Sequence, residues 1–240
     1  SHIFISEHKA ARCDVLRQTY HVNAQVGAED FLPHIDVLVL AVKPAAAAAA
    51  MHETAPYLRR GALVLSIVAG LTMAQIAAAY PRHPIIRAMP NTPLAVGAGM
   101  SAYACSGDAD ASARKAVDVV LGTAGRVVEV KECDLDAVTG LSGSGPAYAF
   151  LMIEALTDGG VAAGLRHDTA QVFAAQTLLG AAQMVLDGAA PAALRAAVTS
   201  PAGTTAAGLR VMENAGVRAA LIEAVLAAAE RSKELGKQQG

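Results

Sequence analysis

The amino-acid sequence predicts an α/β protein in which a Rossmann-like, doubly wound sheet is followed by an all-α domain. In the first half, short apolar runs alternate with helical stretches, which is the pattern of βαβ units joined by right-handed crossovers. From about Cys133 onward, apolar residues recur at helical spacing and we expect no strand. The 240 residues suffice for two domains of ordinary size. We therefore place an α/β domain at residues 1–131 and a helical domain at residues 132–240.

The predicted strands are short and mostly apolar on both faces, as buried parallel strands are. They lie at residues 3–5, 36–42, 62–68, 85–89, 99–104 and 125–130. The helices between them lie at residues 10–19, 44–57, 71–80 and 109–122. In a doubly wound sheet, ligands lie beyond the carboxyl ends of the strands. Lys43 and Asn91 are the notable polar residues at these ends, and each also has a simpler interpretation as a solvated loop residue.

The composition argues against several classes of function. The formal net charge is −2 and no run of Lys or Arg exceeds two neighbours, which argues against a nucleic-acid partner. Three scattered cysteines without a CxxC pair are typical of a reduced, cytoplasmic protein. Seven scattered histidines show no metal-ligand spacing, so we expect no metal site.

One uncharged stretch, residues 61–81, is long enough to span a bilayer. It divides at Gly70 into an apolar strand and a helix, so we interpret it as a strand–turn–helix unit. No signal peptide is evident at the N-terminus. We therefore expect no membrane segment.

A dinucleotide-binding sheet normally begins with a strand and a G-x-G-x-x-G turn, and no such turn precedes Ile3. The run Gly143-Ser144-Gly145-Pro146 follows a helical segment and lacks the third glycine, so it is not this fingerprint. We expect the chain to enter the fold at the second strand, with the first βα unit missing. Because that unit would carry the pyrophosphate cradle, we expect the chain as given to bind a dinucleotide poorly and to be weakly active.

The predicted helices of the second half begin with residues 134–139, which we expect the glycine-rich run 140–146 to break. Two more helices lie at residues 147–163 and 168–186, and Asp168 is expected to cap the second of these. A short helix begins at residue 191, another ends at about residue 214, and the last covers residues 217–235. Several are alanine-rich and apolar on more than one face, which favours burial against a second subunit. We expect at least a homodimer. A membrane bundle is the alternative, and the charged residues along these helices argue against it.

The stretch Val198–Leu209 concentrates hydroxyl and turn residues within this alanine-rich half. Pro201 lacks an amide hydrogen and pushes Ser200 toward an extended conformation, so no helix continues through them. Gly203 allows a close backbone approach, and Thr204 or Thr205 is expected to cap the following helix. A helix start of this kind presents free backbone amides to a carboxylate or a phosphate. An ordinary N-cap between two helices is the alternative.

Four motifs carry a resemblance to a known family. The runs Asp136–Phe150 and Val198–Leu209 are similar to those of pyrroline-5-carboxylate reductase, and so are Leu40–Pro44 and Met89–Pro93. The similarity covers essentially all 240 residues, in order and at the right spacing. The resemblance implies a nicotinamide-dependent reductase that converts 1-pyrroline-5-carboxylate to L-proline, the last step of proline synthesis. It also implies a dinucleotide-binding first domain and a helical second domain that binds substrate and forms a homodimer, or a larger ring of dimers.

The resemblance implies site residues as well. Thr205 is the catalytic residue, with its hydroxyl offered to the ring nitrogen, and it orients or relays rather than acting as a strong acid. The implied substrate-binding residues are Val198, Ser200, Gly203, Thr204 and Thr205. The implied cofactor-binding residues are Ser6, His8, Lys9, Leu40, Ala41, Val42, Lys43, Pro44, Ile67, Ala69, Gly70, Asn91, Ser144, Gly145 and Pro146.

Cofactor preference rests on Ser6-Glu7-His8-Lys9. Ser6, His8 and Lys9 suit a 2′-phosphate, whereas Glu7 suits a 2′-hydroxyl, and the cations favour NADPH over NADH.

Two residues depart from the family pattern. Ala202 stands where glycine is common. Either the alanine only tightens the loop, or a strained backbone there weakens substrate binding. Ala28 falls near where an asparagine often meets the adenosine ribose.

Two alternative functions remain open at this point. A related β-hydroxyacid dehydrogenase would use a lysine on a helix of the second domain, and residues 147–183 contain none. A truncated, non-catalytic dimeric scaffold is the alternative of a different class.

Overall fold

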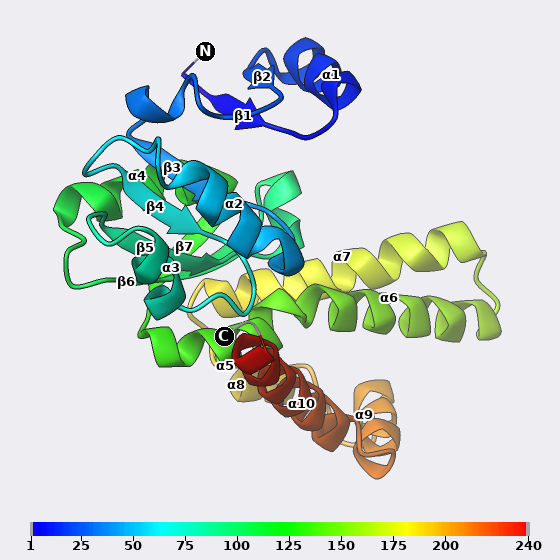
Figure 1. Ribbon diagram of the computed structural model, residues 1–240. Helices are drawn as coiled ribbons and strands as arrows, with labels where there is room; N and C mark the ends of the chain where they lie inside the picture. Colours follow the sequence, from blue (N-terminus) through cyan, green and yellow to red (C-terminus); the bar gives the residue numbers. More distant parts are fainter. Residues whose placement is uncertain (1, 239–240) are drawn as a thin grey trace. The chain divides into compact units, whose positions relative to one another are not determined.

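The structure is a computed structural model that describes residues 2–238, and it consists of two compact units (Figure 1). The first unit comprises Ser1–Thr139 and Ala229–Gly240, and the second comprises Gly140–Ala228. The first unit is therefore discontinuous in sequence. The last helix begins in the second unit and ends in the first.

The first unit alternates strands with helices as predicted. Its strands are β1 (Phe4–Ser6), β2 (Asn23–Gln25), β3 (Val37–Leu40), β4 (Leu63–Ser66), β5 (Ile85–Met89), β6 (Gly99–Cys105) and β7 (Gly125–Glu129). Its helices are α1 (Ala10–Tyr20), α2 (Ala47–Thr54), α3 (Met73–Ala79), α4 (Ala111–Leu121) and α5 (Leu135–Val138), with short 3-10 turns η1 (Leu32–His34), η2 (Pro44–Ala46), η3 (Thr92–Val96), η4 (Gly122–Ala124) and η5 (Glu132–Asp134). The short strand β2 was not predicted, because its three residues include no strongly apolar side chain.

Five strands form one sheet in the order β3-β4-β5-β6-β7. All neighbours are parallel except β5 and β6, which are antiparallel. The prediction of a doubly wound sheet made of crossover units fails at this pair. Only the short η3 segment joins β5 to β6, and a parallel connection needs about a dozen residues or more. Strands β1 and β2 pair in parallel in a separate two-stranded sheet.

Alternation along the strands gives the five-stranded sheet two apolar faces. Val64 of β4 and Ile85 of β5 belong to a buried cluster with Ile76 of α3, on a face also covered by α2. Leu65 of β4 belongs to a second cluster with Val117 of α4. Helices therefore cover both faces, as an α/β layer architecture requires.

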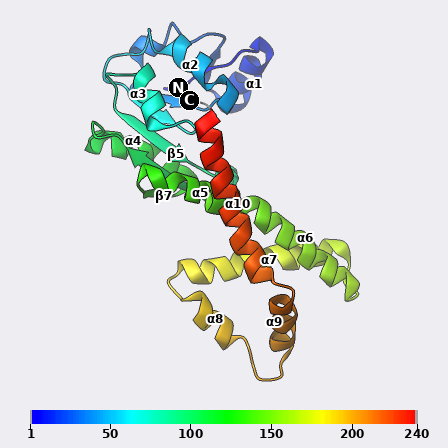
Figure 2. The same ribbon diagram turned by 60° about the horizontal axis from the view of Figure 1, so that its bottom comes forward.

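The second unit is helical. It contains most of the π-helical turn η6 (Thr139–Gly143), then α6 (Gly145–Ala162), α7 (His167–Leu186), α8 (Pro191–Ala197), α9 (Thr204–Asn214) and the first part of α10 (Val217–Gln238). Helices α6 and α7 lie side by side as a hairpin in both views (Figures 1 and 2). A Cβ atom added at Gly160 of α6 would lie 3.0 Å from the Cβ atom of Ala170 of α7, so the two helices pack closely.

Three local predictions in this half were wrong. The glycine-rich run does not break the chain into a loop, because residues 139–143 continue as a π-helical turn. Asp168 lies inside the first turn of α7, whose N-cap is Arg166. Neither Thr204 nor Thr205 caps α9, because Gly203 is the N-cap and the two threonines are its first residues.

Among the described residues, no helix is both long enough and apolar enough to cross a membrane.

Candidate active site

The carboxyl ends of β3 and β4 lie at one edge of the five-stranded sheet. Leu40 is in register with Ser66, and the amide of Ile67 donates to the carbonyl of Leu40 at 3.0 Å. The predicted cofactor residues Leu40–Pro44 and Ile67–Gly70 follow these two strand ends. The structure therefore brings two of the predicted loops together, at the edge where doubly wound sheets bind ligands.

The loop between β4 and α3 turns sharply. Gly70 is buried and has φ +78°, a left-handed conformation that favours glycine. The Oγ atom of Ser66, which is fully buried, accepts from the amide of Val68 at 3.3 Å. The loop ends in a capping box, in which Thr72 and Gln75 each accept a backbone hydrogen bond from the other. These internal hydrogen bonds lie at the two ends of the loop, at Ser66–Val68 and at Thr72–Gln75, with Gly70 between them.

Asn91, after β5, has an internal partner. Its Oδ1 atom accepts from the amide of Met100 at 2.8 Å, which holds the η3 segment to the start of β6. A structural role is thus visible for this predicted cofactor residue.

The end of β1 presents polar side chains. Ser6, His8 and Lys9 are exposed, and among residues 2–238 their side chains have no hydrogen-bond or ion-pair partner. Glu7 has one: its Oε1 atom accepts from the amides of His8 (2.8 Å) and Lys9 (3.3 Å). The carboxylate stabilises the turn, while one hydroxyl and two basic side chains are left open to an anionic ligand.

In the second unit, the predicted residues Ser144, Gly145 and Pro146 lie at the start of α6. Ser144 is the N-cap without a side-chain hydrogen bond, and the proline lies in the first turn. The preceding π-helical turn is a feature often found at functional sites. The hydroxyl of Tyr148 lies 3.3 Å from the carbonyl oxygen of Gly140 and 3.2 Å from that of Ala224 in α10, so this segment is tied within its own unit.

The predicted substrate loop joins α8 to α9. Val198 follows α8, and Ser200 is exposed before the turn. The amide of Gly203 donates to the carbonyl of Ser200 at 3.1 Å, so it is already used. In the described part of the chain, the amides of Thr204 and Thr205 have no acceptor, and the Thr205 hydroxyl has no partner. The open donors are therefore those at the first turn of α9.

Ala202 has φ +56°, the left-handed conformation that usually requires glycine. Of the two alternatives given for this residue, the left-handed backbone agrees with the strained one, and its effect on substrate binding remains a prediction. The neighbouring Gly203 must be glycine for a different reason: there is no room for a side chain, because a Cβ atom there would lie 2.3 Å from Oγ of Ser200. The loop thus has one glycine where contact demands it and an alanine where the backbone would favour glycine.

Sequence reasoning missed a buried ion pair beside the β4–α3 loop. Arg87 of β5 is 8% exposed, and its Nη1 atom lies 3.3 Å from Oε1 of Glu132. The same oxygen accepts from the amide of Met73, the first residue of α3, at 2.7 Å. The available signal was the arginine inside the apolar strand 85–89, since a buried arginine needs a partner.

The groups with shifted pKa values lie elsewhere. Burial raises the pKa of Tyr80, and its hydrogen bond with Thr54, at 2.6 Å, partly offsets this. The Arg114 guanidinium lowers the pKa of Glu129, with which it forms hydrogen bonds of 3.0 and 3.1 Å. These groups stabilise the first unit and belong to none of the predicted site loops.

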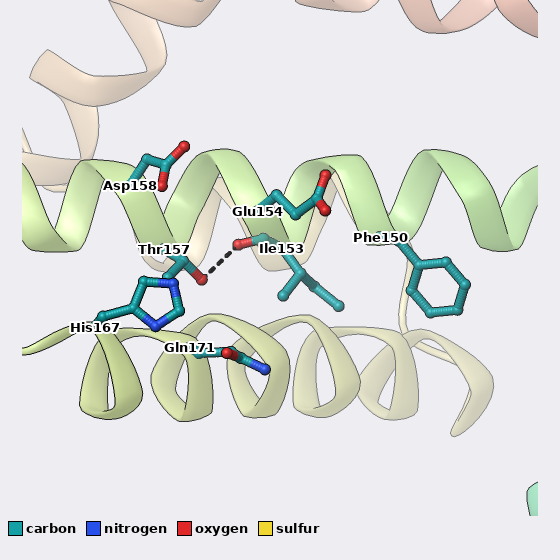
Figure 3. Close-up of a pocket in the computed structure, with 7 residues that line it drawn as sticks. All are labelled: Phe150, Ile153, Glu154, Thr157, Asp158, His167 and Gln171. Carbon is teal, nitrogen blue, oxygen red and sulfur yellow. Dashed lines mark hydrogen bonds between the residues drawn. The ribbon is translucent and has the colours of Figure 1, made fainter.

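A pocket of about 600 Å³ lies on the α6–α7 hairpin (Figure 3). It is lined by Phe150, Ile153, Glu154, Thr157, Asp158, His167 and Gln171. The one buried hydroxyl among them, that of Thr157, donates to the carbonyl of Ile153 at 2.7 Å. None of the predicted site residues lines this pocket. Across residues 2–238, no group of three or more His, Cys, Asp or Glu side chains is placed to hold a metal ion.

A mostly parallel sheet with helices on both faces, followed by a helical unit, is the architecture of a class of protein: NAD(P)-binding oxidoreductases with a helical second domain. Two family models fit this class. Residues 1–70 match one described as NADP oxidoreductase, coenzyme F420-dependent. Residues 132–235 match one described as pyrroline-5-carboxylate reductase dimerisation.

Individual relatives identify the family. The chain is 46% identical to a pyrroline-5-carboxylate reductase of Synechocystis sp., over 98% of this chain and 88% of that protein. It is similar to the structure of a pyrroline-5-carboxylate reductase from Coxiella burnetii, with a TM-score of 0.90, 34% identity, and coverage of 97% of this chain and 88% of that one. For Plasmodium falciparum pyrroline carboxylate reductase with NADP bound, the TM-score is 0.83 at 34% identity, covering 91% and 84%. The chain belongs to the pyrroline-5-carboxylate reductase family, which confirms the resemblance carried by its motifs.

Proposed function

We propose that this protein reduces 1-pyrroline-5-carboxylate to L-proline with a reduced nicotinamide cofactor. Membership of the family supports the reaction. The observation that carries the site is the first turn of α9, where two amides and one hydroxyl are open side by side. The substrate offers two matching groups, a carboxylate and a ring imine nitrogen.

The carboxylate is assigned to the open amides of Thr204 and Thr205. Free N–H groups at a helix start point at an anion, and the helix dipole favours its charge. Ser200 and Val198 line the approach to this turn, and Gly203 keeps it compact through its hydrogen bond to Ser200. This arrangement fixes the substrate by one end.

The ring nitrogen is assigned to the hydroxyl of Thr205. A hydroxyl has a high pKa and is a poor general acid near neutral pH, so its work is to orient the ring and to relay a proton. The rate acceleration comes mainly from alignment, because holding the reacting carbon against its hydride donor removes much of the entropic part of the activation barrier.

The strand-end loops of the first unit fit a dinucleotide. Ser6, His8 and Lys9 have open side chains that suit a 2′-phosphate, while the Glu7 carboxylate is bound to its own turn. We therefore assign NADPH as the preferred cofactor, and a relative in the family was solved with NADP bound. When bound, the cofactor supplies the hydride to the imine carbon. Leu40–Pro44, Ile67–Gly70 and Asn91 are assigned to its binding, together with Ser144–Pro146 of the second unit.

The α6–α7 hairpin is assigned to the subunit interface. Large apolar side chains are exposed on both helices, among them Phe150 (59%), Leu151 (65%) and Phe173 (58%). Exposed apolar area on this scale indicates an interaction surface, and residues 132–235 match the family's dimerisation model. We propose a cytoplasmic homodimer or a larger ring of dimers. Residues 1–131 act as the cofactor domain and 132–240 as the substrate and dimerisation domain.

The test is oxidation of NADPH in the presence of pyrroline-5-carboxylate, compared among three variants. Thr205→Ala is expected to lower kcat by about 10- to 100-fold, while Thr205→Ser, which keeps the hydroxyl, retains most of the activity. Thr199→Ala is the matched control, because that hydroxyl lies in the same loop and donates to the carbonyl of Arg195 at 2.6 Å. An unchanged rate for Thr205→Ala would refute the site, and NADPH oxidation that does not depend on pyrroline-5-carboxylate would refute the reaction.

A further inference from the structure

The last turns of α10 contact the first unit at two points. The Oγ atom of Ser232, a residue only 5% exposed, donates to Oδ1 of Asp136 at 2.6 Å. One helical turn further on, Gly236 faces Gly70: a Cβ atom added at Gly236 would lie 3.2 Å from the carbonyl oxygen of Gly70. Residues four apart lie on one face of a helix, so Ser232 and Gly236 form one contact surface. We call Ser232 and Gly236 the α10 contact.

The partner of this contact is a loop assigned to the cofactor. Gly70 ends the segment Ile67–Gly70 that follows β4, and it is held in a left-handed conformation. All of these residues belong to the first compact unit. The next residues along the chain, at the start of α3, are held by Glu132 through the amide of Met73 at 2.7 Å. The β4–α3 loop is thus held at its end by Glu132 and covered at Gly70 by α10.

The glycine at position 236 requires an explanation. Gly236 lies in the last turn of α10, and it differs from the helical glycines Gly159, Gly180 and Gly208, which have no atom within 4 Å of an added Cβ. At Gly236 the added atom would come closer to Gly70 than most Cβ contacts allow, so either the helix or the loop would move. The absence of a side chain is what lets the backbone of α10 approach the backbone of the loop.

We propose that the α10 contact positions the β4–α3 loop for cofactor binding, with Gly236 as a positioning residue that acts through Gly70. This inference rests on the proposed function, because it takes the loop to be part of the cofactor site. A side chain at Gly236 pushes on the Gly70 carbonyl and displaces the loop by a few tenths of an ångström or more. This displacement weakens cofactor binding. Substrate binding is unaffected, because the substrate loop at Val198–Thr205 belongs to the other unit.

The experiment compares Gly236→Ala and Gly236→Leu with the unaltered protein, by steady-state kinetics and by direct titration with NADPH. We expect KM and Kd for NADPH to rise about twofold to threefold for Ala and about tenfold for Leu, since small displacements in a site cost large factors. The kcat value and KM for pyrroline-5-carboxylate are expected to stay within about twofold. The control is Gly107→Leu, the same change at an exposed glycine of the first unit with open space around it, which leaves all four constants unchanged.

A merely structural glycine would behave differently. Alanine is the better helix former, so Gly236→Ala would then raise thermal stability and leave KM for NADPH unchanged, and this result overturns the proposal. A parallel change in kcat and both KM values also overturns it, because that indicates general disruption. If Gly236→Leu does not fold, Gly236→Ala decides the matter alone. NADPH oxidation that does not depend on pyrroline-5-carboxylate refutes the proposed function instead, and the NADPH titrations still test the α10 contact.

Discussion

Comparing the Arg87–Glu132 ion pair with a second ion pair tests whether burial or interatomic distance determines how much an ion pair stabilises this protein. In the Arg87–Glu132 pair the two atoms are 3.3 Å apart, with side-chain exposures of 10% for Arg87 and 36% for Glu132. The Arg59–Asp36 pair is closer, at 2.6 Å, but its side chains are 48% and 85% exposed. If the distance between the atoms determined the contribution of an ion pair, removing Asp36 would lower the free energy of unfolding more than removing Glu132. If burial determines it, removing Glu132 lowers the free energy of unfolding more.

The expected magnitudes follow from what each carboxylate holds. Glu132→Ala removes a hydrogen bond to the Met73 amide and leaves Arg87 buried without its partner. Loss of one partner of a fully buried pair costs about 3–5 kcal/mol. Because Glu132 is partly open to water, we expect about 2–3 kcal/mol. Asp36→Ala breaks an exposed pair, for which the loss is at most about 1 kcal/mol.

The assay is urea unfolding followed by far-UV circular dichroism at one fixed protomer concentration. With a denaturant slope of about 3 kcal/mol per molar urea, Glu132→Ala is expected to lower the midpoint by about 0.7–1 M. Asp36→Ala is expected to lower it by less than about 0.3 M. Equal shifts, or a larger shift for Asp36→Ala, would show that our reasoning from burial is wrong.

Two further outcomes are expected in the same assay. Ala202→Gly relieves a left-handed alanine with φ +56°, so it should raise the free energy of unfolding by about 0.5–1 kcal/mol; a decrease would contradict the assigned strain. Tyr80 has a pKa raised above its ordinary value of 10.0, so the folded state favours the neutral phenol. Stability is therefore fully present below pH 10.0 and is lost as pH rises through the raised pKa. Tyr80→Phe should flatten this alkaline loss, and an identical pH profile for both proteins would disprove the assignment.

Local pattern was enough to predict most of the elements. Residues 85–89 were predicted as a strand and form β5 with the same bounds, because an apolar run between turn residues has few other solutions. Asn23–Gln25 was missed, because a three-residue strand of polar and small side chains carries no periodic signal. The antiparallel pairing of β5 with β6 was missed as well, since it depends on the length of the connection rather than on the strands.

Part of the candidate site could likewise be predicted from local sequence, and part of it could not. The turn at Val198–Thr205 was found from its own composition, and Ala202 was singled out by comparison with the family motif. The cap was misplaced by one or two residues, because Gly203, Thr204 and Thr205 all suit an N-cap. The partners of Arg87 and of Gly236 were invisible in the sequence, since Glu132 and Gly70 lie far along the chain and no period relates them. The functional roles of the site residues remain predictions.

The division of the first unit between two stretches of sequence has a consequence for how the protein folds. Ala229 and the residues after it contribute to a unit whose other residues end at Thr139. During synthesis, the sheet emerges first, then the whole helical unit, and Ser232 and Gly236 emerge after both. Their contacts with Asp136 and Gly70 close a long loop, whose entropic cost grows only logarithmically with length, by about 0.6 kcal/mol for each doubling. The strands of the sheet thus meet their neighbours early, while the loop at Gly70 acquires its final surroundings only after the helical unit has been synthesised.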